Sequence, residues 1–416
     1  MSTWEEVQLK DIVSILGDGL HGTPEYSEDG EYYFVNGNNL NEGSITINQE
    51  TQKVPYSEYL KYKKELSDRT LLVSINGTLG NVAYYQGEKV LLGKSACYFN
   101  LLDDVDKGFI RYILSTPYFQ KYIQTYANGT TIKNLSLKAM REFSFNLPPL
   151  QEQKQVANIL SCLDRKISNL RQQNETLERI AQTLFKHWFV DFEFPNEDGK
   201  PYKSSGGEMV RSELGEIPAG WYVKKIENVI DVRDGTHESP KQTKEGFHLI
   251  TSKHLKKEGI DFESAYLISE SDYIEANKRS KVDNFDILVS MIGTVGLLYF
   301  VMEKEINFVI KNIGLFKTSK NQNYAEFVFL FLTSVYGKLY FRTRLGGTTQ
   351  SFISLASLRE MNLLIPNELL LLEFRKVAKS IFNKSYANSN QIQVLTKTRD
   401  VLLPKLMSGK LRITTS

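Results

Sequence analysis

The sequence predicts a mixed α+β protein that is built twice from one plan, with each copy ending in a long helix. Two observations lead to this prediction. The second half of the 416-residue chain repeats motifs of the first half in the same order. Each copy also ends in a run whose apolar residues alternate three and four positions apart, which is the pattern of a helix that pairs with another helix.

The repeat is visible as five motifs that keep nearly one spacing. Trp4 aligns with Trp221, Asp18-Gly19-Leu20-His21 with Asp234-Gly235-Thr236-His237, residues 71–82 with 287–298, Gly129-Thr130-Thr131 with Gly347-Thr348-Thr349, and Pro148 with Pro366. The offset stays between 216 and 218 over the whole copy. Chance does not easily keep five motifs in one order, so we infer an internal duplication.

The first part of each copy is predicted to be a mixed domain. The segments 71–75 and 287–291 are rich in β-branched and apolar residues and bounded by turn formers, which is typical of strands. The segments 109–126 and 324–345 carry apolar residues three and four apart and are each predicted to form a helix.

The second part of each copy is predicted to be one long helix, over 150–189 and 368–407. The first heptad seam runs from Val156 to Trp188 without a fault, and the same seam recurs 218 residues later with a more polar middle. At about 1.5 Å per residue such a seam makes a rod of about 50 Å. Each helix packing only on its own domain is the alternative, but a strict repeat of this length favours pairing of the two helices.

One polar residue in each seam predicts the direction and register of that pair. Asn174 lies in the first seam and Asn388 in the second. An antiparallel pair that crosses at position 172 brings the two amides together, whereas a parallel pair leaves each beside an apolar side chain. We therefore expect an antiparallel pair with these amides at about 3 Å or bridged by one water.

Composition and charge exclude several classes of protein. Hydrophobic residues make up 41% and charged residues 24%, which excludes disorder and fibrous repeats. Two cysteines cannot form a disulfide framework or a four-thiolate zinc site and fit a reducing cytoplasm. The start lacks a signal peptide, and the apolar runs 327–335 and 363–372 are too short to span a bilayer, so no membrane partner is expected.

The net charge differs between the two halves of the chain. Residues 1–195 carry 20 basic and 24 acidic residues (net −4), and the remainder carries 31 and 25 (net +6). The excess of basic residues in the second half is compatible with a phosphate-rich partner, but it is small.

We find no pattern that predicts an active site, a metal or a cofactor. The Gly-Lys-Ser at 93–95 lacks the upstream glycine spacing of a phosphate-binding loop. The five histidines have no metal-ligand spacing, and His21 and His237, which recur in equivalent places, are better explained as hydrogen-bonding residues near a turn.

Several loops instead offer donors and acceptors suited to base edges and phosphates, although the same residue types are also ordinary turn formers. The presence of Gly-Thr-Thr ahead of the long helix in both copies favours a binding role. The candidate DNA-contacting residues are His21, Thr23, Asn38, Thr130, Thr131, Lys133 and Asn134 in the first copy, and His237, Lys253, Lys256, Lys257, Thr348, Thr349, Gln350 and Ser351 in the second.

Residues 147–195, beginning LPPLQEQKQVANIL, closely resemble the central conserved region of type I restriction–modification specificity subunits. Residues 398–413 resemble the distal conserved region, and Gly220-Trp221 fits the start of the second repeat. The resemblance implies two target-recognition domains, at 1–147 and 221–365, with spacer helices within 148–194 and 366–416 that form an antiparallel coiled coil, and a linker at 195–220.

This resemblance also implies a function and partners. The two domains would read the halves of a split, asymmetric site in double-stranded DNA. Two modification subunits would methylate adenine, and restriction subunits would join through the complex, while the chain itself would be non-catalytic, without cofactors. The alternatives are a scaffold that joins two protein partners without touching DNA and, less favoured, an orphan methyltransferase, whose Asn- or Asp-Pro-Pro-aromatic motif is missing here.

Overall fold

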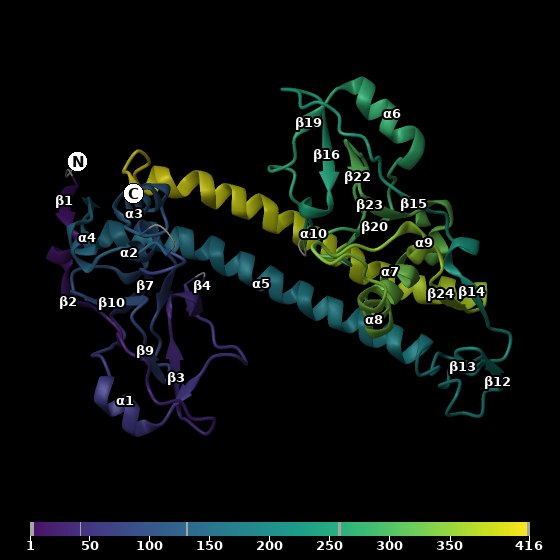
Figure 1. The fold of residues 1–416 in the computed structure, drawn as a ribbon, viewed down its shortest axis with the longest axis horizontal. Coiled ribbons are helices and arrows are strands. Elements are labelled where there is room, and N and C mark those ends of the chain that lie inside the picture. The colour runs from purple at the N-terminus through teal and green to yellow at the C-terminus, as the bar shows by residue number, and fades with distance from the viewer. Residues whose placement is uncertain (1–3, 42, 130–131, 257–258, 414–416) are drawn as a thin grey trace. The chain divides into compact units, whose positions relative to one another are not determined.

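The computed structural model describes residues 4–41, 43–129, 132–256 and 259–413 (Figure 1). It divides into two compact units, one formed by Met1–Ser168 with Gln393–Ser416 and the other by Asn169–Ile392. Each unit contains one globular part and a length of both long helices, so each is described by itself.

The first unit is built on a four-stranded antiparallel sheet in the order β2-β10-β7-β8. Its strands are β2 (Val13–Asp18), β10 (Ala96–Leu101), β7 (Thr70–Ser74) and β8 (Val82–Tyr84). Every residue of β7 is buried, which explains its unbroken apolar run. A second sheet, in the order β6-β3-β9, consists of β6 (Lys53–Val54), β3 (Tyr32–Val35) and β9 (Val90–Leu92). The unit also contains two separate strand pairs: β4 (Leu40–Asn41) with β5 (Ser44–Ile45), and β1 (Glu5–Gln8) with β11 (Ser144–Leu147). The short helices are α1 (Tyr56–Tyr62), α2 (Lys107–Ile113), α3 (Pro117–Tyr126) and α4 (Leu137–Glu142).

The second unit repeats this topology strand for strand. Its sheets are β15-β23-β20-β21 and β19-β16-β22, with the pairs β17-β18 and β14-β24. The strands are β15 (Val232–Asp234), β23 (Ile313–Phe316), β20 (Ile287–Ser290), β21 (Leu298–Phe300), β19 (Leu267–Ile268), β16 (Phe247–Thr251), β22 (Phe308–Lys311), β17 (Leu255–Lys256), β18 (Gly259–Ile260), β14 (Tyr222–Lys225) and β24 (Asn362–Ile365). The helices are α6 (Glu270–Ser280), α7 (Ala325–Thr333), α8 (Val335–Thr343) and α9 (Leu355–Arg359). The duplicated α+β fold is therefore confirmed.

Individual side chains keep the repeat offset as well. The Tyr122 hydroxyl donates to the Ala139 carbonyl at 2.8 Å, and the Tyr340 hydroxyl donates to the Ser357 carbonyl at the same distance. Both pairs are related by 218 residues, as the sequence motifs are.

The single helices predicted over 109–126 and 324–345 are wrong, because each region forms two helices. Thr116 caps α3 by accepting from the Phe119 amide, and Pro117 occupies its first turn. Ser334 caps α8 by accepting from the Gly337 amide. The apolar periodicity continues across both breaks, which is why the pattern did not reveal them.

The two long helices, α5 (Leu150–Phe189) and α10 (Glu368–Met407), have the predicted bounds. Pro148 and Pro149 precede α5, and the Pro148 carbonyl accepts from Gln153 Nε2 at 2.8 Å. Asn367 precedes α10 and accepts from the Leu370 amide at 2.8 Å. Gly409, with a φ of +69°, follows the end of α10.

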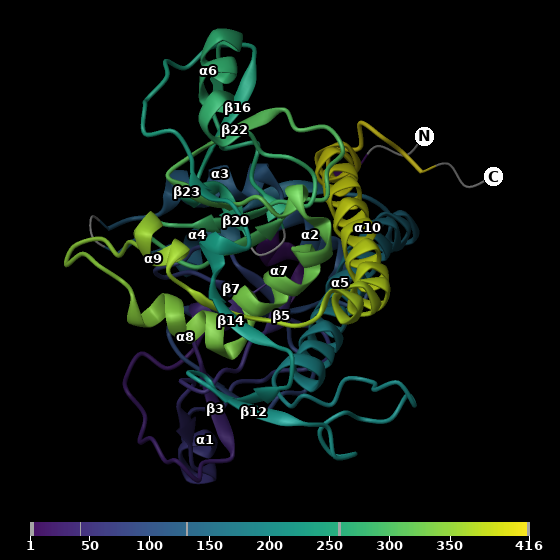
Figure 2. The same ribbon diagram turned by 90° about the vertical axis from the view of Figure 1, so that its right-hand side faces the viewer.

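Within each unit the two long helices pack antiparallel (Figures 1 and 2). In the first unit Asp164 binds Arg399 of α10 at 3.0 Å, and Glu152 binds Arg412, which follows the end of α10, at 2.6 Å. In the second unit Phe185 packs against Phe374, with ring centroids 6.5 Å apart. Residue numbers thus rise along α5 as they fall along α10, and the two helices form the predicted antiparallel coiled coil.

A polar layer interrupts the apolar seam in the second unit. The Asn388 Nδ2 donates to Asn174 Oδ1 at 2.9 Å, close to the predicted distance of about 3 Å. Asn174 Nδ2 in turn donates to the Ser389 hydroxyl at 3.1 Å and the Ser385 carbonyl at 3.3 Å. Asn388 is only 1% exposed, so these bonds satisfy groups that water does not reach. That these two amides also fix the register stays a prediction.

The segment 195–220 is ordered. It contains a hairpin of β12 (Met209–Ser212) and β13 (Gly215–Pro218). Phe194 stacks on Tyr202 at 4.6 Å and on Trp221 at 5.3 Å. The segment thus packs on the start of the second globular part, and its assignment as a linker, like the other domain boundaries, stays a prediction.

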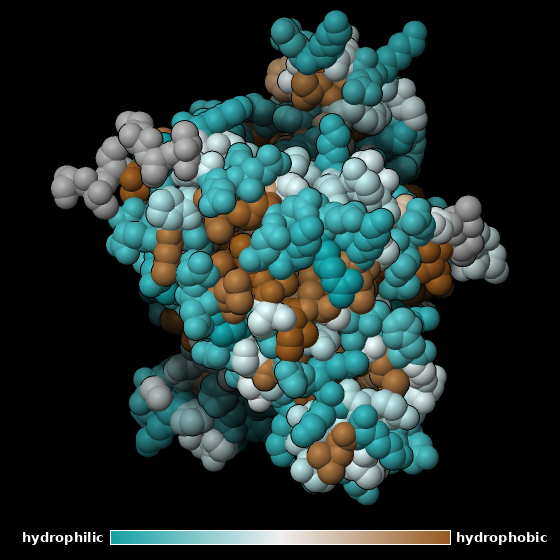
Figure 3. Space-filling view, turned by 90° about the vertical axis from the view of Figure 1, so that its left-hand side faces the viewer, coloured by the Kyte–Doolittle hydropathy of each residue, from teal (hydrophilic) through white to brown (hydrophobic). Residues whose placement is uncertain are grey.

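Figure 3 shows the side of the first unit that carries β1 and β2 in Figure 1. Hydrophobic residues gather near the middle of this face, with hydrophilic residues around them. Val7 and Val13 are half-buried in these strands.

Among the described helices, none is long and apolar enough to cross a membrane.

Candidate nucleic-acid interface

Five segments of the first unit meet at one end of its main sheet, and we call them the first loop cluster. They are residues 18–24, 36–39, 75–78, 93–95 and the described part of 128–134. Ser95 links three of them, because its hydroxyl accepts from the Gly37 amide at 2.8 Å and donates to Asn36 Oδ1 at 2.8 Å, and its carbonyl accepts from the Ile75 amide at 2.9 Å.

The remaining two segments are held by backbone bonds. The Leu20 amide donates to the Leu92 carbonyl at 2.7 Å, beside Gly93, and the Gly77 amide donates to the Lys133 carbonyl at 3.0 Å. The side-chain amides of Asn76 and Asn134 also meet at 3.2 Å. Tight backbone joints therefore place exposed polar side chains from five separate segments next to one another.

The second unit builds the same arrangement from residues 234–240, 251–254, 291–294, 311–312 and 346–352, the second loop cluster. The Thr236 amide donates to the Ile310 carbonyl at 3.0 Å, and the Gly293 amide donates to the Ser351 carbonyl at 2.9 Å. The Ser252 hydroxyl binds the Asn312 carbonyl at 3.1 Å and accepts from the Met291 amide at 3.2 Å. The two backbone joints recur in the first unit, whereas Ser252 here takes the linking role that Ser95 has there.

A groove of about 610 Å³ lies in the second loop cluster. The predicted residues Lys253, Lys256 and Gln350 line it together with Asn312 and Thr294. Two ammonium groups and two carboxamides along one open groove match the contacts that DNA offers, because lysine suits phosphates and Asn or Gln suits adenine edges.

The two recurring histidines occupy matching places. His21 Nε2 lies 2.7 Å from Asp18, and His237 Nε2 lies 3.0 Å from Asp234. The His237 ring also meets Asn312 Oδ1 at 2.9 Å, which connects it to the groove. Both histidines are exposed and hydrogen-bonded near a turn. Among the described residues, no group of three or more His, Cys, Asp or Glu is placed to hold a metal ion.

The glycine of each Gly-Thr-Thr motif has a structural cause. Gly129 and Gly347 have φ values of +108° and +90°. A Cβ at either position would lie within 2.3 Å of a carbonyl three residues later, so only glycine fits the turn. The turn explains the glycine but not the exposed Thr348 and Thr349 that follow it.

The structure places the predicted contact residues on the surface of the loop clusters, except Lys256, which lies in β17 next to the second loop cluster and lines its groove. Those with described positions are all exposed: His21, Thr23, Asn38, Lys133, Asn134, His237, Lys253, Lys256, Thr348, Thr349, Gln350 and Ser351. Thr348, Thr349 and Ser351 are in the second loop cluster but do not line the groove. Thr130, Thr131 and Lys257 lie outside the described residues.

Sequence reasoning missed Asn312 and the lysine beside it. Asn312 has a φ of +53°, a left-handed conformation that asparagine tolerates, and it lines the groove. Lys311 matches Lys94 in the sequence at an offset of 217, but the equivalent bridges Leu20–Gly93 and Thr236–Lys311 place Lys311 where the first copy has Gly93. Aligning 93–99 with 310–316 by sequence would have marked Lys311, because Lys94 and Phe99 recur there as Lys311 and Phe316.

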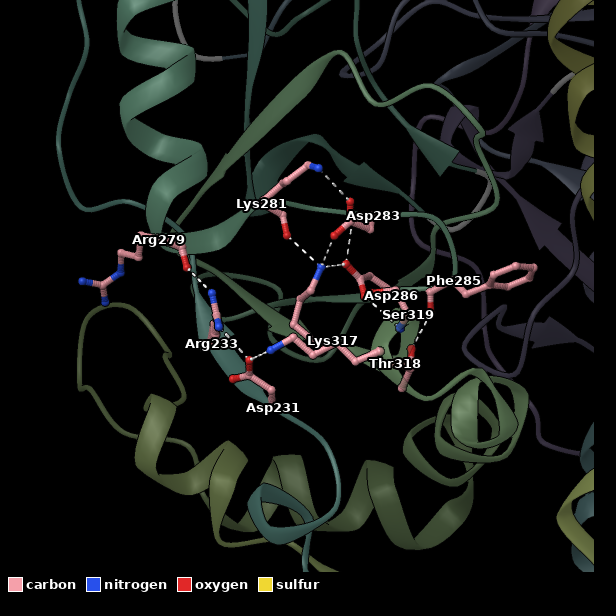
Figure 4. A network of polar contacts seen from close by, with 11 residues as sticks. Asp231, Arg233, Arg279, Lys281, Asp283, Phe285, Asp286, Lys317, Thr318 and Ser319 are labelled. Carbon is pink, nitrogen blue, oxygen red and sulfur yellow. Dashed lines mark hydrogen bonds and ion pairs between the residues drawn. The ribbon is translucent and has the colours of Figure 1, made fainter. Parts of the chain in front are cut away.

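A buried ion-pair network joins β20 and β23 at the ends of these strands opposite the second loop cluster (Figure 4). Lys317 Nζ lies 2.6 Å from Asp286 and 2.7 Å from Asp283. Asp286 is fully buried and Lys317 is 5% exposed, so the pair holds the entry of β20 against the exit of β23. Burial raises the pKa of Asp286, and the Lys317 ammonium opposes that rise.

The same network extends to the surface. Arg233 binds Asp231 at 2.8 Å and donates to the Arg279 carbonyl at 3.0 Å. The Arg279 side chain pairs with Asp234, the partner of His237. The ion pairs thus fix the strand end from which the histidine loop begins.

A duplicated fold with a matching exposed loop cluster on each copy defines a two-site recognition protein. The chain belongs to the family of the type I restriction modification DNA specificity domain, whose sequence model matches residues 1–179 and 218–368.

Similar proteins support this assignment. The MjaIX type I restriction enzyme specificity subunit of Methanocaldococcus jannaschii is 27% identical, over 99% of this chain and 94% of the relative. The HindI specificity subunit of Haemophilus influenzae is 24% identical, over 71% of this chain and 75% of the relative. The crystal structure of a type I restriction-modification S subunit from M. genitalium has the same fold, with a TM-score of 0.61, 18% identity, and coverage of 99% of this chain and 97% of that one.

Proposed function

We propose that this chain is the specificity subunit of a type I restriction–modification complex and reads a split, asymmetric site in double-stranded DNA, one half with each loop cluster. The observation that supports this most directly is that both clusters share one backbone plan but present different side chains. Asn38 in the first corresponds to Lys253 in the second, in matching turns after β3 and β16. Ile132 corresponds to Gln350 at the 218-residue offset. One scaffold with two sets of contacts is what two different half-sites require.

In this proposal the long helices set the distance between the half-sites. Two modification subunits methylate adenine within the bound site, and restriction subunits join through the complex in the cytoplasm. The chain contributes recognition and spacing, with no catalytic group or cofactor of its own. The base to be methylated leaves the stack only in the partner subunit.

The test is to co-express the chain with its cognate modification subunit and to map methyladenine across the host genome. We expect methylation at one motif made of two short halves separated by unread bases. Absence of methylation together with no retention on DNA would instead support the scaffold that joins protein partners.

Replacing Thr348 and Thr349 together by alanine should weaken specific binding more than non-specific binding. Both hydroxyls are exposed in the second loop cluster, and loss of base-edge contacts costs about 1–3 kcal/mol per base pair read. Titration of the complex against target and scrambled duplexes measures both affinities. An equal loss on the two duplexes would make these threonines backbone contacts.

Replacing Lys253 and Lys256 by methionine provides the contrasting variant. If each lysine neutralises one phosphate, affinity falls on all sequences, and the slope of log affinity against log salt becomes shallower by about 2. Lys224→Met, at an exposed lysine of β14 outside the second loop cluster, is the matched control and should leave the slope unchanged.

A further inference from the structure

One carboxylate in the first unit joins the globular part to both long helices. Asp164 of α5 accepts from Arg111 Nη1 at 2.9 Å and from the Tyr112 hydroxyl at 2.7 Å, both on α2. It also accepts from Arg399 Nη1 of α10 at 3.0 Å. Three helices that are distant in sequence therefore meet on two oxygens, and we call these four residues the ionic hub.

The hub is largely removed from solvent. The side chains of Arg111 and Asp164 are 14% and 22% exposed. Burial alone would raise the pKa of Asp164, but the bonds from Tyr112 and Arg399 and the charge of Arg111 hold it below its ordinary value. The carboxylate is therefore ionised at neutral pH and accepts from all three donors. The other ionisable groups near the hub are Tyr84 of β8, Asp106 before α2, and Asp400, which also binds Arg399.

The second unit has no charged side chain at the positions equivalent to the hub, although Glu326 of α7 and Arg375 of α10 form an ion pair at 3.3 Å elsewhere in its junction. By the repeat offsets, Tyr84, Arg111, Tyr112, Asp164 and Arg399 correspond to Phe300, Phe329, Leu330, Phe382 and Ala181. The rings of Phe300, Phe329 and Phe382 pack on one another with centroids 5.0–5.5 Å apart. Ala181 and Leu330 are buried in the same core. An aromatic cluster thus stands where the first unit has its ionic hub.

We infer that Asp164 is a positioning residue: in addition to the apolar core that the first recognition domain shares with the long helices, its charged hydrogen bonds set how the domain is oriented on the helix pair, whereas aromatic packing occupies the equivalent positions in the second unit. Charged hydrogen bonds are directional and need all their partners in place, whereas apolar contacts tolerate small rotations. The orientation of the first loop cluster should therefore be sensitive to Asp164, a side chain that lies outside the cluster. The consequence for DNA rests on the proposed function, because it concerns how well one half-site is read.

The experiment uses the full chain with Asp164→Asn, which removes the charge and keeps the shape. Hydrogen exchange should become faster in α2 and in 393–407, with β7 and β10 still protected and α7 unchanged. In the complex with the modification subunit, affinity is compared between a duplex with one intact half-site and a duplex with both half-sites scrambled. The gain in affinity from one half-site should fall about tenfold in the variant, and the gain from the other half-site should not change. Glu142→Gln, which removes an exposed pair with Lys138 in the same unit, is the matched control.

A second variant transplants the junction of the second unit into the first, with Tyr84→Phe, Arg111→Phe, Tyr112→Leu, Asp164→Phe and Arg399→Ala. It should restore the half-site gain to within about threefold of the original chain. If the half-site gain required the charge of Asp164 itself, this uncharged junction would not restore it.

Each other outcome has a distinct meaning. Unchanged exchange in α2 and an unchanged half-site gain in Asp164→Asn would overturn the inference. Loss of protection in β7 and β10 would show that Asp164 is needed for folding, and would overturn it too. If the original chain gains nothing from either half-site but Asp164→Asn still loosens α2, the proposed function fails while the junction argument holds.

Discussion

Lys317→Met is expected to destabilise the second unit by about 3–5 kcal/mol, because it leaves the buried Asp286 carboxylate without its cation. Methionine keeps the length of the lysine stem, so the loss is electrostatic. The remaining donors to Asp286 are the backbone amides of Asp283 and Ser319, at 2.7 and 3.1 Å. Hydrogen exchange of β20 and β23, compared with β7 and β10 of the first unit, measures the effect where it arises.

The pH dependence of this variant follows from the direction of the shift. Burial already raises the pKa of Asp286 above its unfolded value, and removing Lys317 raises it further. A carboxyl with a raised folded pKa destabilises most where it is ionised, so the deficit should be larger at about pH 7.5 than at about pH 5. Lys281→Met is the control, because Lys281 is 67% exposed and lies 3.4 Å from Asp283. A deficit of similar size in both variants would show that burial of the pair is not the cause.

Asn388→Leu is expected to cost about 1–3 kcal/mol, because it leaves the Asn174 carbonyl oxygen facing an apolar side chain. Asn174→Leu should cost a similar amount. The double variant should recover most of the loss, since neither amide is then left unpaired, and the cycle should give a coupling of about 1–2 kcal/mol. Hydrogen exchange of α5 and α10 within the second unit provides the stabilities.

The double variant also tests whether the amides set the register. With leucine at both positions the seam no longer distinguishes neighbouring registers, so cysteine pairs placed for the native and shifted registers should both crosslink. Asn158→Leu, on an exposed position of α5, should change neither stability nor crosslinking. Crosslinking in the native register alone would mean that the globular parts, and not the asparagines, align the helices.

The long helices were predictable because their signal is local and periodic. The heptad seam from Val156 to Trp188 and its break at Pro148-Pro149 are contained in one stretch of chain. The Asn174–Asn388 contact followed from the repeat, since symmetry related one seam to the other. The breaks at Thr116 and Ser334 were not predictable from apolar spacing, because a single capping side chain decides them.

The loop clusters were only partly predictable, for a different reason. The exposed residues could be selected by type, but their grouping depends on joints such as Gly293 to Ser351, which connect segments far apart in sequence. Asn312 carries no local sign of its role beyond a residue type that tolerates a positive φ. The junction at Asp164 became visible only when the structure brought Arg111 and Arg399 to the same carboxylate.

The division of each long helix between the two units has a consequence for synthesis of the chain. The core of the first unit includes Leu403, Leu406 and Met407, which pack with Val156 and Leu160. The ribosome makes residues 393–413 only after the whole second globular part, about 225 residues (393 minus 168) beyond the rest of the first unit. At about 5–20 residues per second, residues 393–413 are synthesised about 10–45 s after the first part of α5. During that time the apolar face of α5 in the first unit lacks the side chains that cover it. The domain that is translated first is therefore the last to complete its core.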